Sequence, residues 1–170
     1  MLAVADTSPI NYLVLLERTA LLPTLYTHVV LPPAVTHELL DAEAPEVVHA
    51  WAAHLPPWCE VRRPTSLEGT EALAHLGAGE WEAIVLAQEL RADVLLIDEE
   101  DGRHAALSRG LTVTGMLGVL ERAAERSLID LPSTLTQLHS TRQKRIQRTG
   151  SLRSKRRGRK SSFCLGLSRK

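Results

Sequence analysis

The chain is poor in aromatic residues and cysteine, and it has no long apolar run. Aromatic side chains make up 4% of the 170 residues, so aliphatic side chains are expected to fill the interior. No stretch approaches the roughly 20 apolar residues of a membrane-spanning helix, which predicts no membrane association. Cys59 and Cys164 are far apart and lack zinc-ligand spacing, so reduced thiols are expected. No basic segment precedes Asp6, which disfavours a signal peptide and predicts a cytoplasmic protein.

Lysine is absent from the first 140 residues. This part contains all 20 Asp and Glu but only eight Arg, a net charge of −12, whereas residues 141–170 contain 12 Lys and Arg and no acid. We therefore expect a globular domain over residues 1–140 and a basic, disordered tail over residues 141–170. The tail has three open interpretations: a non-specific phosphate-binding arm, a segment that folds back onto the acidic domain, or an extension without function.

Short apolar runs alternate with helical patterns along the first 131 residues. Strands are expected at 2–5, 29–31 and 93–97, with weaker ones within 56–64 and at 111–114. Ser8 is expected to cap the first helix and Pro9 to occupy its first position. Further helices are expected at 21–25, 34–40, 45–54, 80–90, 102–108 and 116–126, and from about 131. This alternation predicts an α/β fold with a parallel sheet covered by helices on both faces.

Two acids directly follow predicted strands. Asp6 follows the first strand and Asp98 follows the most apolar one. Ligands of open parallel sheets gather outside the carboxyl ends of the strands, so both acids are placed where a site is expected. Taken singly, Asp6 is better explained as a helix-capping or turn residue, and Asp98 as the start of the solvated acidic loop Asp98–Asp101.

Two further acids are expected on the buried faces of helices. Glu38 falls on the same helical stripe as Val35 and Leu39, and Glu80 falls on the apolar side of its helix, with Glu82 on the opposite side. A carboxylate on an inward stripe is costly unless it is paired, protonated or bound to a cation. Alternatively, Glu38 reaches solvent or pairs with an arginine, and Glu80 stabilises the first turn of its helix by less than about 1 kcal/mol.

The acids Asp6, Glu38, Glu80 and Asp98 are therefore predicted to converge at one end of the sheet. Grouped carboxylates repel one another unless a cation is present. Hard divalent cations prefer oxygen ligands, and Mg²⁺ works with a few carboxylates and a substrate phosphate. The sequence thus predicts a Mg²⁺ or Mn²⁺ site.

Several motifs resemble those of the PIN-domain family, in particular a branch related to VapC-type toxins. They are Asp6-Thr-Ser-Pro, Pro32-Pro-Ala-Val-x-x-Glu38-Leu, Gly79-Glu80-x-Glu82-Ala-Ile, Leu96-Ile-Asp98 and Gly115-x-x-Gly-Val-Leu, spread over about residues 2–131. The resemblance implies a three-layer α/β/α sandwich and a Mg²⁺- or Mn²⁺-dependent ribonuclease. It also implies a role as the toxin of a type II toxin–antitoxin pair, with an antitoxin partner and a homodimer.

The resemblance also implies roles for individual residues. Asp6, Glu38 and Asp98 match the metal-binding acids, and the remaining acid falls in the Gly-Glu-x-Glu stretch as Glu80 or, alternatively, Glu82. Thr7 or Ser8 would orient Asp6 or a bound water. Where the toxins have Thr-x-Asp, this chain has Asp98–Asp101, which leaves open which acids of this loop bind metal.

Two other functions compete with the nuclease. A PIN-like domain that binds RNA or protein without turnover would lack a complete metal set. A phosphoacceptor receiver domain would need paired acids after the first strand and a late lysine, and residues 1–140 contain no lysine.

Overall fold

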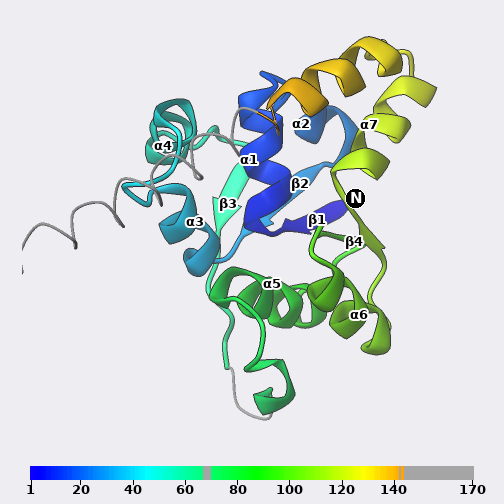
Figure 1. Ribbon diagram of the computed structural model, residues 1–170. Coiled ribbons are helices and arrows are strands. Elements are labelled where there is room, and N and C mark those ends of the chain that lie inside the picture. The colour runs from blue at the N-terminus through cyan, green and yellow to red at the C-terminus, as the bar shows by residue number, and fades with distance from the viewer. Residues whose placement is uncertain (67–69, 142, 144–170) are drawn as a thin grey trace, which may run out of the picture.

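The computed structural model describes residues 1–66, 70–141 and 143, and it contains a five-stranded parallel sheet (Figure 1). The strand order is β3-β2-β1-β4-β5. Val4 in the central strand pairs with Val30 on one side and Leu95 on the other. The strands are β1 (Leu2–Ala5), β2 (His28–Leu31), β3 (Cys59–Val61), β4 (Val94–Leu96) and β5 (Val113–Thr114). The predicted parallel α/β sheet is confirmed.

Helices cover both faces of the sheet, because successive strand residues point to opposite sides. Ala3 and Ala5 pack into one apolar cluster, whereas Val4 packs into the other. The first cluster lies beneath α1 (Thr7–Leu15), α2 (Leu21–Leu25), α3 (Pro33–Leu39), α4 (Glu46–Ala53) and α7 (Met116–Glu125). The second lies beneath α5 (Ala78–Glu89), α6 (Glu100–Ser108) and the short 3₁₀ helix η1 (Glu71–Leu73). Figure 1 shows these as two helical layers around the sheet, so the three-layer sandwich is confirmed.

Four helices, α1, α3, α5 and α6, begin one or two residues earlier than predicted, and the shifts in α1 and α6 affect acidic residues. Helix α1 begins at Thr7, so Asp6 rather than Ser8 occupies the cap position, and Pro9 is the third helical residue rather than the first. Helix α6 begins at Glu100 rather than Gly102, which places Glu100 and Asp101 in its first turn. Acidic side chains there interact favourably with the helix dipole, which explains why a run of acids can begin a helix.

A last helical segment over residues 131–141 packs against the first cluster. Leu138 is buried and Leu135 lies against the core, so both side chains attach this helix, predicted from about residue 131, to the domain. The predicted disorder of the basic tail falls on residues outside the described part, as does Cys164; Cys59 is buried with a free thiol. In the described part of the chain, no helix is long and apolar enough to cross a membrane.

Candidate functional site

The order in which strands are added to the sheet reverses at β1. After β1 the chain moves to β2 and β3 on one side, and then crosses to β4 and β5 on the other. Such a switch point leaves a crevice between the connections, where open α/β sheets bind ligands. Asp6 lies at this point, directly after β1, and its backbone N–H donates to Leu96 O of β4 at 2.9 Å. Its side chain is only 3% exposed.

Burial changes the acidity of Asp6. Removal from water, together with smaller contributions from the charges of Glu80 and Glu38, raises the pKa of its carboxyl group from 3.8 to about 7. The backbone N–H groups of Thr7 and Ser8 act in the opposite direction, although neither makes a full capping hydrogen bond to the carboxylate. Near neutral pH, Asp6 is therefore close to half-protonated in the absence of a cation.

Glu38 reaches the same place from α3, but it is exposed rather than on the buried face that the sequence predicts. The buried face of α3 consists instead of Val35, Thr36 and Leu39. Thr36 can be buried because its hydroxyl donates a hydrogen bond to Pro33 O. Glu38 Oε2 accepts a hydrogen bond from Thr7 Oγ1 at 2.5 Å, and Oε1 accepts one from Gly79 N at 3.1 Å. The Thr7 hydroxyl therefore orients Glu38, whereas Asp6 interacts with the backbone N–H of Thr7.

Gly79 lies between Asp6 and Glu38. A Cβ atom at this position would be 2.9 Å from Glu38 Oε1 and 3.1 Å from Asp6 Oδ1, so the two carboxylates surround one point. Gly79 belongs to the first turn of α5, whose N-terminus lies at the carboxyl edge of the sheet. The structure thus brings together Asp6 and Glu38, as predicted, and adds the start of α5.

Glu80, the next residue of α5, places its two carboxylate oxygens in different surroundings. Oε2 accepts a hydrogen bond from Gly77 N at 3.0 Å, whereas Oε1 is buried and has no hydrogen-bond partner among the described residues. Burial raises the pKa of Glu80, the Gly77 N–H lowers it, and the charges of Glu99, Glu38 and Asp101 raise it. Asp6, Glu38 and Glu80 therefore form one electrostatic group, which we call the acid cluster.

Glu82 does not share the surroundings of this group. Its Oε2 accepts a hydrogen bond from Ala34 N, at the start of α3, at 2.9 Å. Acceptance of a free N–H at a helix N-terminus is a structural role for this carboxylate. Of the two acids in the Gly-Glu-x-Glu stretch, Glu80 is therefore the one that lies with Asp6 and Glu38.

Asp98 also bonds to a helix terminus. Its Oδ1 accepts a hydrogen bond from Met116 N at 2.8 Å and lies against Gly115, at the start of α7. The charges of the acidic loop that act on Glu80 are instead those of Glu99 and Asp101. Both belong to the loop for which the sequence leaves open which acids bind metal, and their position directly after the most apolar strand is the signal that points to them.

The acid cluster fits a hard divalent cation in its chemistry. All of its donors are carboxylate oxygens, and one of them, Glu80 Oε1, is buried without a partner. Asp6 is buried, Glu80 is half-buried and Glu38 is exposed. A cation would remove the repulsion among the three carboxylates and the need of Asp6 for a proton. Within residues 1–66, 70–141 and 143, no three acidic, histidine or cysteine side chains are already arranged as a complete ligand set. Binding would therefore require these side chains to move toward one another.

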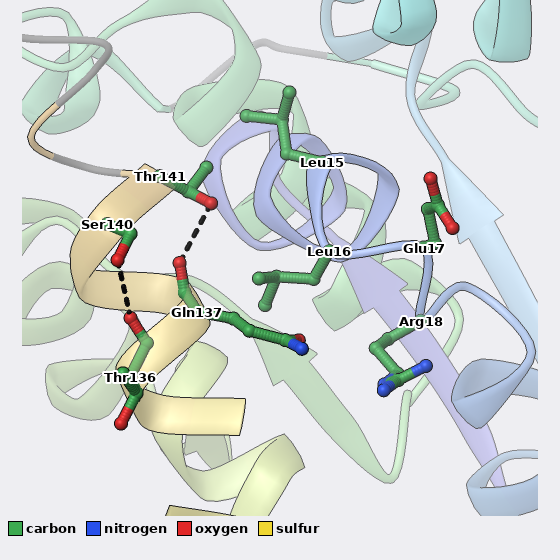
Figure 2. A pocket seen from close by; sticks show the side chains of 8 residues that line it. All are labelled: Leu15, Leu16, Glu17, Arg18, Thr136, Gln137, Ser140 and Thr141. Carbon is green, nitrogen blue, oxygen red and sulfur yellow. Dashed lines mark hydrogen bonds between the residues drawn. The ribbon is translucent and has the colours of Figure 1, made fainter. Parts of the chain in front are cut away.

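A separate pocket of about 400 Å³ lies at the far end of α1 from Asp6. Figure 2 shows it between the end of α1 and the segment 131–141, where the hydroxyl groups of Ser140 and Thr141 donate to the backbone carbonyls of Thr136 and Gln137. Its lining contains none of the acids predicted to bind metal. The pocket is therefore distinct from the acid cluster.

Comparisons with known proteins identify the family of the chain. A family model described as a PIN domain matches residues 2–154. A solved PilT N-terminus domain protein from the hyperthermophilic archaeon Sulfolobus solfataricus is similar in structure, with a TM-score of 0.48 and 17% sequence identity over 72% of this chain and 93% of that one. No curated protein matches the chain significantly. Because the family model covers most of its length, the chain belongs to the PIN-domain family, whose members are typically nucleases.

Proposed function

We propose that the chain is a Mg²⁺- or Mn²⁺-dependent ribonuclease whose metal ligands are Asp6, Glu38 and Glu80. The observation that carries this proposal is the acid cluster itself. A deeply buried aspartate with a pKa raised to about 7 lies beside two glutamates at the switch point of the sheet. Perturbed carboxylates grouped in this way are typical of functional sites.

The chain's own residues would hold the cation and keep it in place. Thr7 and Gly79 hold the two oxygens of Glu38 through hydrogen bonds, and Gly77 holds one oxygen of Glu80. The free oxygen of Glu80 and the carboxylate of Asp6 would then turn toward the ion. A divalent cation supplies an activated water and neutralises the charge that develops on the phosphate.

RNA must approach this edge despite the acidity of residues 1–140. Arg103 lies there, because its Nη1 donates to Ile97 O at the end of β4, at 3.0 Å. We infer that Arg103, the bound cation and the basic segment 141–170 together offset the repulsion between the acidic domain and RNA.

The biological role proposed here is that of the toxin in a type II toxin–antitoxin pair. Its support is the resemblance of the five motifs to VapC-type toxins. A cognate antitoxin and a homodimer belong to the same proposal. Induced expression in a bacterial host tests the role: the wild-type protein should arrest growth, and the Asp6→Asn variant should not. Equal growth with both proteins would contradict the toxin role without bearing on the nuclease.

Cleavage of a mixed RNA pool by the purified full-length protein tests the nuclease. Cleavage should occur with Mn²⁺ or Mg²⁺, stop with EDTA and fall by about 100-fold or more in Asp6→Asn. Glu89→Gln is the matched control, because Glu89 lies at the far end of α5 and accepts backbone hydrogen bonds from Thr65 and Ser66. It should cleave like the wild type. Cleavage that survives Asp6→Asn would indicate a contaminating nuclease.

A second candidate function is a PIN-like module that binds RNA or protein without turnover. The position of Asp98 favours it, since this acid bonds to Met116 N at the start of α7. Folded protein that binds RNA but does not cleave it with either metal would support this alternative.

A further inference from the structure

Two glycines in the first turns of neighbouring helices press against the acid cluster. Gly79 of α5 lies against Glu38 and Asp6, as described above. Gly102 of α6 lies against Glu80: a Cβ atom at position 102 would be 2.5 Å from Glu80 Oε1 and 2.6 Å from Ile97 Cδ1. Both glycines are buried. Distances this short leave no room for a side chain while the carboxylates keep their positions.

Neither glycine is required by the backbone conformation. Among the described glycines only Gly110 has a positive φ, so Gly79 and Gly102 have backbones that alanine adopts readily. Alanine is also the better helix former, and it would normally be favoured at helical positions. What excludes a side chain at these two positions is therefore the close approach of the carboxylates and, at Gly102, of Ile97 as well.

We propose that Gly79 and Gly102 are positioning residues that set the places of the cluster carboxylates. Gly79 lets the start of α5 close onto Glu38 and donates its N–H to Oε1 of that residue. Gly102 lets the start of α6 close onto Glu80, on the side of its unpartnered oxygen. Each glycine thereby acts on a different carboxylate. As a claim about cation binding, this inference rests on the proposed function.

The pairing of each glycine with its own acid gives a sharp test. Gly79→Ala and Gly102→Ala should each weaken Mn²⁺ binding to the full chain by about 10- to 100-fold, as changes beside metal ligands commonly do. Shortening the crowded acid makes room for the added methyl group. Glu38→Asp should therefore recover part of the loss caused by Gly79→Ala, and Glu80→Asp part of the loss caused by Gly102→Ala. The crossed pairs should recover nothing.

Isothermal titration with MnCl₂ measures these affinities, and thermal unfolding confirms that each variant is folded. Gln88→Ala, an exposed change on α5, is the control and should bind like the wild type. Unchanged affinity in both alanine variants would overturn the proposal. Equal recovery by matched and crossed pairs would overturn it too, because it would indicate general loosening rather than local crowding.

A crystal structure of Gly79→Ala tests the geometry without any metal. The proposal predicts that Glu38 moves and that its hydrogen bond with Thr7 is lost. An unmoved Glu38 would contradict it. If wild-type protein bound no Mn²⁺, the proposed function would fail, while this structure would still decide whether Gly79 positions Glu38. Should Gly79→Ala not fold, the structure of Gly102→Ala answers the same question for Glu80.

Discussion

Thr7 Oγ1 donates a hydrogen bond to Glu38 Oε2, and this bond joins the start of α1 to α3 at the carboxyl edge of the sheet. Thr7 directly follows Asp6, so one short segment supplies the buried Asp6 and also orients the exposed Glu38. Glu38 is exposed, and its orientation depends on Thr7 and on Gly79 N rather than on packing.

Thr7→Val keeps the shape of the side chain and removes its donor. Because a hydrogen bond to a charged group contributes about 1.5–3 kcal/mol, we expect Mn²⁺ affinity to fall by about tenfold or more. Titration with MnCl₂ measures this. Thr24→Val, which removes an exposed hydroxyl that donates only to Ala20 O, should have no effect. Equal losses in both variants would refute the positioning role of Thr7.

Asp6 should make the cation-free protein less stable as the pH rises. Between about pH 4 and 7 the unfolded chain has lost the Asp6 proton and the folded protein still holds it, so the free energy of unfolding falls through this window and levels off above it. Asp6→Asn should remove the contribution of Asp6 to this dependence and stabilise the protein above pH 7 by up to about 4 kcal/mol. Urea unfolding in EDTA from pH 4 to 8 measures both proteins. An Asn variant less stable than the wild type at pH 8 would contradict the account.

Cation binding should show the opposite dependence on pH. A cation must displace the proton of Asp6, whose pKa is raised to about 7, so Mn²⁺ affinity should increase about tenfold per pH unit below 7 and little above it. Calorimetric titrations at several pH values determine the slope. A flat profile from pH 5.5 to 7 would mean that Asp6 does not contact the ion.

Substitutions of Glu80 and Glu82 should differ in their effect on RNA cleavage. Glu80→Gln should lower RNA cleavage by about 100-fold or more, because it removes the charge of a proposed ligand. Glu82→Gln keeps an oxygen acceptor for Ala34 N and should lose less than about 1 kcal/mol of stability with little change in cleavage. The reverse pattern of cleavage would assign the metal ligand to Glu82.

Asp98 should matter mainly for the attachment of α7. Asp98→Ala leaves Met116 N without its acceptor and should cost about 1–3 kcal/mol of stability in urea unfolding. Glu99→Gln, an exposed change in the same loop, should leave stability unchanged. Loss of Mn²⁺ binding in Asp98→Ala without loss of stability would instead make Asp98 a ligand.

The sequence predicts the sheet, and the places of Asp6, Glu80 and Asp98 at its carboxyl edge, because these follow from short-range patterns. Asp6 and Asp98 follow strands, and Glu80 lies in a first helical turn, so the edge that they share follows from the topology of parallel sheets. The exposure of Glu38 cannot be predicted from such local patterns. In a helix as short as α3, a polar residue such as Thr36 can take a buried position by bonding to its own backbone, which shifts the buried face away from Glu38.

The roles of individual carboxylates depend on contacts between distant segments. The bonds from Met116 N to Asp98 and from Ala34 N to Glu82 each join residues far apart in sequence, and no local pattern encodes them. The early start of α6 likewise depends on a run of acids favoured by the helix dipole, where the pattern of apolar residues suggested a loop.

The most direct test of the central claim is a crystal structure of the full chain with Mn²⁺, with the ion located by its anomalous scattering. The account predicts an ion in contact with Asp6, Glu38 and Glu80, and no such ion in crystals of Asp6→Asn. An ion bound elsewhere, or an acid cluster that stays empty at millimolar Mn²⁺ above pH 7, would contradict it.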